Sequence, residues 1–355
     1  MRILYLIPTL DGGGAERQLA LLAPALAQSG VETGVAFHSG GPNYDLLNTG
    51  EVDLLPLPAR GNHHPMQLWD IISLVRIWKP DLIQTYLTKM DILGGLAAKI
   101  TRTPHILSER SSAMMYAQGW KNTARVGLGK SAKAIIANSE GGAHYWRSLG
   151  AAGQIDVIPN ALRPLKTAEP EHPWEGKPYL VSAGRLSPEK NAVTAAKALI
   201  AALKRMPTVY AAIIGDGPDR DLVADIVSNS GVSERLRILG YTDKLDTWLR
   251  YAVAYISASY VEGHPNVVME AAQAKCPLIL SDIPAHWEAI GNGATYVEAE
   301  NIDGFTDALV TTMCDPAATA NHVRNALAKT KALQFDAIIP RYRKLYWQCL
   351  QTGVS

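Results

Sequence analysis

The stretch MRILYLIPTLDGGGAERQLALLAPALAQ (residues 1–28) indicates the fold class. Its apolar run Ile3–Ile7 has the length of a buried strand and is followed by three glycines, Gly12–Gly14. Arg17–Gln28 then carries apolar residues at the i, i+3, i+4 spacing of an amphipathic helix. A strand that leads through glycine into a helix is typical of a parallel α/β domain, and the same order recurs where Tyr179–Ser182 precedes Gly184.

Short apolar runs alternate with helical segments along the whole chain. Continuous apolar strands between amphipathic helices indicate parallel sheets that are covered on both faces, which places the protein in the α/β class. The further strands predicted in this way are Leu82–Gln84, Ile106–Ser108, Ala134–Ala137, Tyr210–Ile214, Ala254–Ser257 and Leu278–Ser281.

The chain length predicts two domains, because 355 residues exceed what one hydrophobic core usually supports. Four prolines (Pro164, Pro170, Pro173 and Pro178) among charged residues indicate a linker between them. We expect doubly wound, Rossmann-like domains at residues 1–165 and 175–335. They would face each other across a cleft at the carboxyl ends of their strands, where such sheets bind ligands. The final segment, 336–355, is expected to form a helix that packs either back on the first domain or on the second.

Composition excludes several function classes. The formal net charge of +1 gives no bias toward nucleic acid, and 47% hydrophobic with 19% charged residues is ordinary for a globular protein. The three cysteines are widely spaced and form no metal-ligand pattern, which fits a cytoplasmic compartment. Ile3–Ile7 ends at Pro8, too short for a signal peptide, and no apolar run has the length of a membrane span.

The segment EGHPNVVMEA (Glu262–Ala271) carries the strongest chemical signal. Its glycine and proline favour a tight turn, and Asn266 is expected to be the N-cap of a helix. The free amides of the first helical turn would then form an anion site. A diphosphate bound there would lie between Glu270, near a ribose, and Glu262, near a sugar, since carboxylates accept hydrogen bonds from hydroxyl groups. The alternative is a capped helix with two solvated glutamates.

The segment GRLSPEKN (Gly184–Asn191) directly follows a predicted strand. Arg185 and Lys190 in this loop suit a diphosphate leaving group, because arginine binds phosphate oxygens in a bidentate way and lysine acts as a point charge. The alternative is two charges on a surface loop.

The glycines of Gly12–Gly14 allow a close approach of the backbone to a phosphate. Their spacing is not that of a dinucleotide-binding fingerprint, and no acidic residue ends an evident second strand, so a nicotinamide cofactor is disfavoured.

Taken in order, these motifs resemble those of the family four retaining glycosyltransferases, which have the GT-B fold (glycosyl transferases group 1). The two glutamates have the E-x7-E form of that family, Gly184–Asn191 is similar to its G-R-L-x-x-x-K-N motif, and Gly215–Pro218 to its G-x-G-P motif. The early glycine loop and Ser139-Glu140 also match, so the resemblance covers nearly the whole chain.

The resemblance implies roles for individual residues. Arg185 and Lys190 would hold the diphosphate, Glu270 the ribose, and Glu262 hydroxyl groups of the transferred sugar. It implies a metal-independent reaction with no cofactor beyond the nucleotide-diphosphate sugar as co-substrate. The remaining donor-binding candidates are Gly13, Gly14, Gly184, Gly215, His264, Asn266 and Val267.

One position departs from the family pattern. Many members carry a histidine just after a strand of the first domain, where this chain has Glu109-Arg110. Either residue is therefore a candidate for the acceptor side.

The expected function is transfer of a hexosyl or N-acetylhexosaminyl group to a saccharide or lipid-linked saccharide, in cell-surface polysaccharide or lipid-linked glycan synthesis. The alternatives are a nucleotide-sugar epimerase and a non-catalytic nucleotide-sugar-binding protein. An anionic membrane surface is a further expected partner, which would place the protein at the inner face of the cell membrane. The basis is a helix with basic residues (Lys121, Arg125, Lys130 and Lys133) beside Trp120; the alternative is a solvated helix face.

Overall fold

The computed structural model describes residues 1–61, 64–111, 119–165 and 174–351. The chain divides into two compact units, which are treated separately below. Unit 1 consists of Met1–Arg163 and Leu333–Ser355, and unit 2 of Pro164–Ala332. Most of the predicted linker lies outside the described residues.

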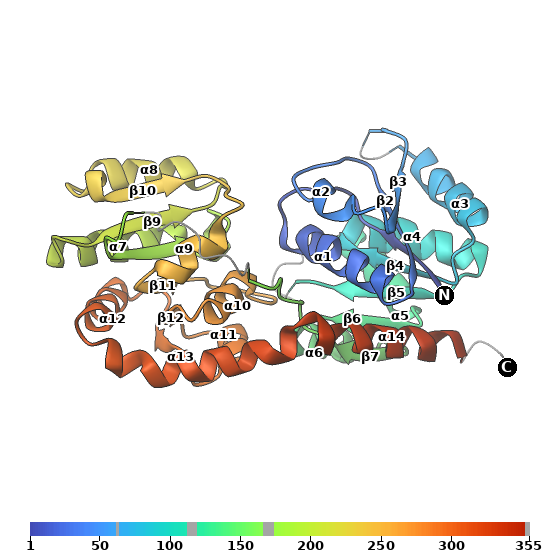
Figure 1. Ribbon diagram of the computed structural model, residues 1–355. Helices are drawn as coiled ribbons and strands as arrows, with labels where there is room; N and C mark the ends of the chain where they lie inside the picture. The colour runs from blue at the N-terminus through green and yellow to red at the C-terminus, as the bar shows by residue number, and fades with distance from the viewer. Residues whose placement is uncertain (62–63, 112–118, 166–173, 352–355) are drawn as a thin grey trace. The chain divides into compact units, whose positions relative to one another are not determined.

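Unit 1 is built on a parallel sheet with the order β3-β2-β1-β4-β5-β6-β7 (Figure 1). Every neighbouring pair is parallel, and β1 pairs with β2 on one side and β4 on the other. The predicted α/β class is therefore confirmed. The strands are β1 (Arg2–Leu6), β2 (Glu32–Phe37), β3 (Val52–Pro56), β4 (Leu82–Tyr86), β5 (His105–Glu109), β6 (Ala134–Ala137) and β7 (Gln154–Val157).

Helices cover both faces of this sheet, as the alternation of side chains along β1 requires. Ile3 and Tyr5 belong to one buried cluster, together with residues of α1 and α14. Leu4 and Leu6 belong to another, together with residues of α3 and α4. The helices of unit 1 are α1 (Gly14–Gln28), α2 (Tyr44–Leu47), α3 (Met66–Trp78), α4 (Leu87–Thr101), α5 (Trp120–Lys130), α6 (Glu140–Ser148) and α14 (Phe335–Gln351).

Helix α14 belongs to unit 1 although it follows unit 2 in the sequence. The Tyr346 hydroxyl donates to Gln84 Oε1 at 2.6 Å and lies 2.9 Å from the Tyr5 hydroxyl. Both tyrosines are fully buried. The Leu162 amide also donates to the Leu333 carbonyl at 2.8 Å. The last helix therefore completes the core that the first strand begins.

Unit 2 has a second parallel sheet, with the order β10-β9-β8-β11-β12-β13 (Figure 1). Its largest core lies where α7 and α12 cover β8, β9 and β11. The strands are β8 (Tyr179–Ala183), β9 (Tyr210–Ile214), β10 (Leu236–Leu239), β11 (Ala254–Ser257), β12 (Leu278–Ser281) and β13 (Thr295–Val297). The helices are η2 (Pro188–Lys190), α7 (Ala192–Arg205), α8 (Arg220–Ser228), η3 (Ser233–Arg235), α9 (Leu245–Tyr251), α10 (Asn266–Gln273), α11 (Pro284–Ile290), α12 (Ile302–Cys314), α13 (Pro316–Thr330) and η4 (Lys331–Leu333).

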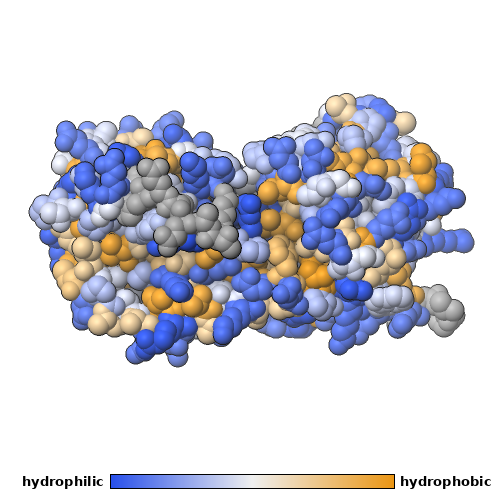
Figure 2. All heavy atoms as spheres, in the orientation of Figure 1, coloured by the Kyte–Doolittle hydropathy of each residue, from blue (hydrophilic) through white to orange (hydrophobic). Residues whose placement is uncertain are grey.

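The surface of each unit is mixed in character. On the face shown in Figure 2, hydrophilic residues predominate and hydrophobic residues emerge in small groups between them. Among the helices of the described ranges, none is long and apolar enough to cross a bilayer.

Candidate functional site

The candidate donor site lies at the point in unit 2 where the strand order reverses. Strands β8 and β11 pair directly there, and the chain leaves them toward opposite edges of the sheet. Open α/β sheets bind ligands at the carboxyl ends of such strands. The loop after β8 carries Arg185 and Lys190, and the loop after β11 carries Glu262. The topology thus brings together three residues that lie far apart in the sequence.

Lys190 and Glu262 form an ion pair between these two loops. Lys190 Nζ lies 2.5 Å from Glu262 Oε2, and the side chains are 31% and 8% exposed. The Ser259 hydroxyl donates to the other oxygen of Glu262 at 2.9 Å, and the Tyr260 amide donates to the Glu189 carbonyl at 2.9 Å. The pair is therefore held on both sides, and the lysine remains accessible.

Arg185 is the available cation of the site. It is exposed and makes no hydrogen bond or ion pair within the part of the chain that the structure describes. The nearby carboxylate of Glu189 forms no ion pair with Arg185 and instead accepts a hydrogen bond from the Ser187 hydroxyl at 2.7 Å. The pKa of Glu189 is lowered: burial opposes the shift, but this hydrogen bond and the charges of Arg185 and Lys190 outweigh it. Arg185 is thus placed beside the ion pair without being neutralised by it.

Two glycines after β9 fix the shape of the Arg185 loop. Gly215 has φ +138°, and a Cβ atom there would collide with the carbonyl oxygen of Gly184. A Cβ atom at Gly217 would likewise collide with the carbonyl oxygen of Leu186. The close approach allows Gly184 N to donate to Ile214 O at 2.9 Å, which extends the β8–β9 pairing beyond the strands. Gly184 and Gly215 therefore shape the loop through their backbones.

Helix α10 begins one residue earlier than expected. The prediction that Asn266 is the N-cap is wrong, because Pro265 occupies that position and Asn266 is the first helical residue. The Asn266 amide donates to the His264 carbonyl at 2.9 Å, and its side-chain oxygen lies 3.4 Å from His264 Nδ1. The amides of Val267 and Val268 make no backbone hydrogen bond in the described structure. The first turn thus keeps two free donors, as an anion site requires.

The negative charges of Glu262 and Glu270, the two glutamates of the E-x7-E motif, both influence the pKa of the Tyr255 hydroxyl. Tyr255 donates its hydroxyl to the Ala183 carbonyl at 3.0 Å, directly before Gly184. Burial raises the pKa of Tyr255, and the negative charges of Glu262 and Glu270 raise it further. Both carboxylates therefore lie near the Tyr255 hydroxyl, which contacts the backbone directly before the Arg185 loop.

The sequence did not reveal His286, which lies beside the ion pair. It is fully buried after β12, and its Nδ1 lies 2.8 Å from the Ser281 carbonyl, which makes Nδ1 the protonated nitrogen. Burial lowers the pKa of His286, and the charges of Glu262 and Lys190 also act on it, in opposite directions. Its Nε2 has no hydrogen-bond partner in the described structure. A single histidine after a strand gave no signal in the sequence.

In unit 1, the glycine loop precedes α1 as predicted, with Gly13 as the N-cap and Gly14 as the first helical residue. The carboxylate of Glu16 folds back over this end of the helix, into the space that a Gly13 side chain would need. A negative group at a helix N-terminus is stabilising. The Glu16 carboxylate therefore occupies the end of the helix at which the glycine loop is predicted to approach a phosphate.

The two acceptor-side candidates point to opposite faces of the sheet, because they are adjacent at the end of β5. Glu109 is fully buried. It accepts hydrogen bonds from Arg125 Nη2 at 2.9 Å, from Trp146 Nε1 at 2.8 Å and from the Ser111 amide at 2.9 Å. In this conformation its carboxylate supports the interior of unit 1.

Arg110 lies on the other face, among uncharged partners. Its guanidinium donates to the Tyr342 hydroxyl at 2.7 Å, the Asn160 side chain at 3.0 Å and the Tyr86 hydroxyl at 3.3 Å. Its Nε is buried and has no hydrogen-bond partner in the described residues. Burial raises the pKa of Tyr86 to about 12, although the Arg110 charge works against this. Tyr86 therefore stays neutral at physiological pH and does not neutralise the charge of Arg110.

Helix α5 does not present the basic face that its sequence suggests. Arg125 is 1% exposed and pairs with Asp91 at 2.7 Å as well as with Glu109. Lys133 lies beyond the helix, directly before β6. Only Trp120, Lys121 and Lys130 of the predicted set are exposed on α5. Buried salt bridges such as that of Arg125 require a partner, and the sequence pattern alone does not distinguish them from surface charges.

No group of three or more histidine, cysteine, aspartate or glutamate side chains in the described part of the chain is arranged to hold a metal ion.

Comparisons with protein families cover both units. Residues 12–164 match the model described as Glycosyltransferase Family 4, and residues 166–330 match the model described as Glycosyl transferases group 1. Two curated relatives match along most of their length. LpsE, a lipopolysaccharide core biosynthesis glycosyltransferase of Rhizobium meliloti, is 26% identical over 325 residues, 89% of each chain. The GalNAc-alpha-(1->4)-GalNAc-alpha-(1->3)-diNAcBac-PP-undecaprenol alpha-1,4-N-acetyl-D-galactosaminyltransferase of Campylobacter jejuni is 26% identical over 313 residues, 86% of this chain and 84% of that one.

Solved structures share the fold over nearly the whole chain. HepE of Anabaena, in complex with UDP and glucose, has a TM-score of 0.84 at 18% identity and covers 97% of this chain and 99% of its own. Sucrose-phosphate synthase of Thermosynechococcus elongatus has a TM-score of 0.80 at 18% identity and covers 99% of this chain and 100% of its own. At these identities the likeness concerns the fold.

Proposed function

This chain belongs to the group 1 glycosyltransferase family and has the GT-B fold, and on that basis we propose that it is a retaining enzyme that uses a nucleotide-diphosphate sugar. The transferred group is a hexosyl or N-acetylhexosaminyl unit, and the acceptor is a saccharide. The relatives named for lipopolysaccharide core and undecaprenol-linked glycan synthesis support an acceptor of that kind.

One observation carries this proposal: Arg185, the Lys190–Glu262 ion pair and the free amides of Val267 and Val268 gather where the strand order of unit 2 reverses. Two cations and two backbone donors match a diphosphate, which carries its charge on several oxygens. Glu262, directly beside Lys190, then suits the hydroxyl groups of the attached sugar. Glu270, one turn into α10, suits the ribose.

The proposed reaction proceeds on one face of the sugar. The bond from the anomeric carbon to the phosphate oxygen breaks, and the bond from the acceptor oxygen to the same carbon forms on that face. The departing phosphate oxygen takes the acceptor proton, so the products are a glycoside of retained configuration and a nucleoside diphosphate. Lys190 and Arg185 stabilise the negative charge that develops on the leaving group, which is the largest contribution that such a site makes to the rate.

On the acceptor side, the proposal rests on Arg110. Its uncharged partners Tyr86, Asn160 and Tyr342 fix the guanidinium without neutralising it. A fixed cation that its partners do not neutralise suits a negatively charged group, such as the diphosphate of a lipid-linked saccharide.

A membrane-bound acceptor also calls for contact with an anionic membrane surface, as we further propose for α5. Trp120 is 71% exposed at the start of this helix, beside the exposed Lys121. An exposed aromatic ring with an adjacent lysine favours the interface of an anionic bilayer. We expect the protein to sediment with phosphatidylglycerol vesicles at low salt, and Trp120→Ala to weaken this binding. Absence of sedimentation at low salt would contradict the proposal.

The decisive experiment for the enzymatic proposal begins with a thermal-shift panel of nucleoside diphosphates. A ligand at 100 times its Kd stabilises the native state by about 2.7 kcal/mol, which is readily measured. The nucleotide sugar that corresponds to the best ligand is then incubated with lipid-linked saccharide acceptors, and the product is analysed by NMR. Retention at the anomeric carbon and acceptor-dependent release of nucleoside diphosphate are expected. An inverted product refutes the retaining mechanism, an epimerised sugar without acceptor refutes transfer, and binding without turnover indicates a non-catalytic protein.

A further inference from the structure

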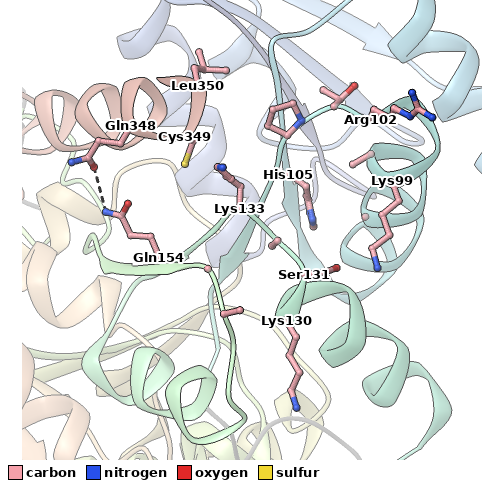
Figure 3. A pocket seen from close by; sticks show the side chains of 17 residues that line it. Lys99, Arg102, His105, Lys130, Ser131, Lys133, Gln154, Gln348, Cys349 and Leu350 are labelled. Atoms are coloured by element: carbon pink, nitrogen blue, oxygen red, sulfur yellow. Dashed lines mark hydrogen bonds between the residues drawn. The ribbon is translucent and has the colours of Figure 1, made fainter. Parts of the chain in front are cut away.

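Unit 1 contains a hollow of about 860 Å³ at the edge of its sheet where β5, β6 and β7 begin. This is the edge opposite to the carboxyl ends of the strands, so the hollow is separate from the acceptor side described above. Its wall consists of the end of α4, the segment that leads into β5, the segment between α5 and β6, the start of β7 and the end of α14. Figure 3 shows how these five parts of the fold surround it.

Four cationic side chains line the hollow, and no carboxylate does. Lys99 and Arg102 come from the end of α4, while Lys130 and Lys133 come from the segment that joins α5 to β6 (Figure 3). In a protein with a net charge of +1, such a cluster is not a consequence of composition.

Three of these cations lack a counter-ion. Lys99, Arg102 and Lys130 form no ion pair and no side-chain hydrogen bond with any other described residue. Lys133 has an acidic neighbour, Asp156. The charges of both residues influence the pKa of the Cys349 thiol. Burial raises the pKa of this thiol to about 11, against the Lys133 charge and with the Asp156 charge.

Helix ends offset part of this charge but not most of it. Lys99 lies in the last turn of α4 and Lys130 in the last turn of α5, where cations complement the helix dipole. Each helix end is equivalent to about half a negative charge. With Asp156 included, the local negative charge is about two units against four cations, so about two positive charges remain without compensation.

The neutral groups of the wall are hydrogen-bonding groups. Ser131, Thr103 and the amides of Gln154 and Gln348 line the hollow, and the two amides lie 3.3 Å apart. His105 at the start of β5 is buried, and burial lowers its pKa to about 4, so it is neutral at pH 7. The wall therefore offers hydroxyl and amide groups next to the cations, as binding sites for phosphate groups do.

We propose that this hollow, the basic pocket of unit 1, binds a phosphate-bearing ligand with at least two negative charges. Arg102 suits a bidentate contact with phosphate oxygens, and the lysines act as point charges around it. The shared chemistry is a phosphomonoester or diphosphate group, and it comes either from a free metabolite or from the headgroup of an anionic lipid.

The first test is calorimetric titration of the whole protein with inorganic pyrophosphate at low salt. To weaken the donor site, all titrations use the Arg185→Met/Lys190→Met background and contain no nucleoside diphosphate, which would itself compete for a phosphate pocket. We expect one saturable site, and at least about a tenfold loss of affinity in the triple variant Lys99→Gln/Arg102→Gln/Lys130→Gln, because each lost charge-assisted bond weakens binding.

The control removes the same charge from elsewhere in unit 1. Arg76→Gln/Lys79→Asn/Arg343→Gln changes three exposed cations that do not line the pocket. We expect this variant to keep pyrophosphate affinity within about twofold, because its changes affect only the long-range field. Equal losses in both triple variants, or absence of saturable binding in the parent, would overturn the proposal. Circular dichroism of both variants establishes that unit 1 is folded.

The second test distinguishes the sources of the phosphate group. Phosphatidylglycerol and phosphatidylcholine vesicles are sedimented with the protein in the presence and absence of pyrophosphate. If the ligand is a lipid headgroup, pyrophosphate competes with phosphatidylglycerol and the pocket variant loses the competed fraction. If it is a free metabolite, vesicle binding is unaffected by pyrophosphate and by the pocket substitutions. Either source of the phosphate group is accepted only if the pocket triple variant also binds pyrophosphate more weakly than the control triple variant in the calorimetric titration.

Discussion

Replacement of Lys190 by methionine separates binding of the leaving group from its stabilisation during the reaction. Methionine keeps the length of the side chain and removes the charge that lies 2.5 Å from Glu262. A charge-assisted hydrogen bond contributes about 1.5–3 kcal/mol. Because the lysine is 31% exposed, the lower value applies to a bound nucleoside diphosphate, which corresponds to about tenfold weaker binding.

The loss of transition-state stabilisation is expected to be larger than the loss of nucleotide binding. Negative charge accumulates on the leaving diphosphate as the bond to the sugar breaks, so the upper value of about 3 kcal/mol applies to the transition state. We therefore expect kcat/KM to fall by about 150-fold, and kcat by about tenfold, because about half of the loss is already present in the bound ground state. Initial rates with the identified donor and calorimetric titration with its nucleoside diphosphate measure these two quantities. Lys197→Met, an exposed lysine of α7 in the same unit, is the matched control.

Glu262→Gln gives the converse result if the reasoning is correct. Removal of the carboxylate frees Lys190 from its ion pair, so nucleoside diphosphate should bind at least as tightly as to the parent protein while turnover falls. Turnover of Lys190→Met within threefold of the parent, or parallel losses of nucleotide affinity in both variants, would refute the assigned roles.

Three further predictions concern the fold, the loop and the chemistry. Arg125→Met leaves two buried carboxylates without a cation and should cost about 3–5 kcal/mol in urea unfolding. Burial raises the pKa of Asp91 to about 6, above its unfolded value, so this group's stabilising contribution falls as pH rises from about 4 to 6. The free energy of unfolding lost through Arg125→Met should accordingly be smaller at pH 5 than at pH 8. Equal losses at the two pH values would contradict this explanation. Gly215→Ala should destabilise unit 2 by at least about 2 kcal/mol, because of its positive φ and the collision with Gly184, whereas Gly240→Ala, with ordinary contacts, should be nearly neutral. Turnover should be unchanged within twofold by EDTA, since Arg185 and Lys190 supply the positive charge, and a loss restored by added Mg²⁺ would show otherwise.

The interior strands were predictable from the sequence, and the edge strands were not. Ala134–Ala137, Tyr210–Ile214, Ala254–Ser257 and Leu278–Ser281 have the bounds that their apolar runs predict. The strands that escaped notice include all four sheet edges, β3, β7, β10 and β13. An edge strand is paired on one side only, so polar side chains interrupt its apolar run, as Gln154 and Asp156 do in β7.

Strand β2 was missed for a different reason. It is an interior strand, but Gly34 lies at its centre and breaks the apolar run. A Cβ atom at Gly34 would meet the ring of Trp78 at 2.8 Å, so the glycine makes room for a side chain of α3. A glycine required by packing against a distant helix cannot be told from a turn glycine in the sequence.

The candidate site was predictable where its residues lie in loops of recognisable composition. The loops that carry Arg185, Lys190 and Glu262 follow strands and contain glycine or proline, which the sequence displays directly. What it does not display is pairing between distant segments: the burial of Arg125, the neutral partners of Arg110 and the place of His286 all depend on contacts across the sheet. Tertiary contacts decide whether a charged side chain is a ligand contact or an internal support.

The place of α14 in unit 1 has a consequence for synthesis on the ribosome. Tyr5 is synthesised 341 residues before its partner Tyr346, and the whole of unit 2 is made between them. At translation rates of roughly 5–20 residues per second, the apolar surface around β1 waits on the order of 20–70 seconds for the helix that covers it. During that interval unit 2 can fold by itself, whereas the apolar surface around β1 in unit 1 stays accessible to chaperones and to other nascent chains. Unit 1 is thus expected to reach its native state after unit 2, although its first strand is synthesised earlier.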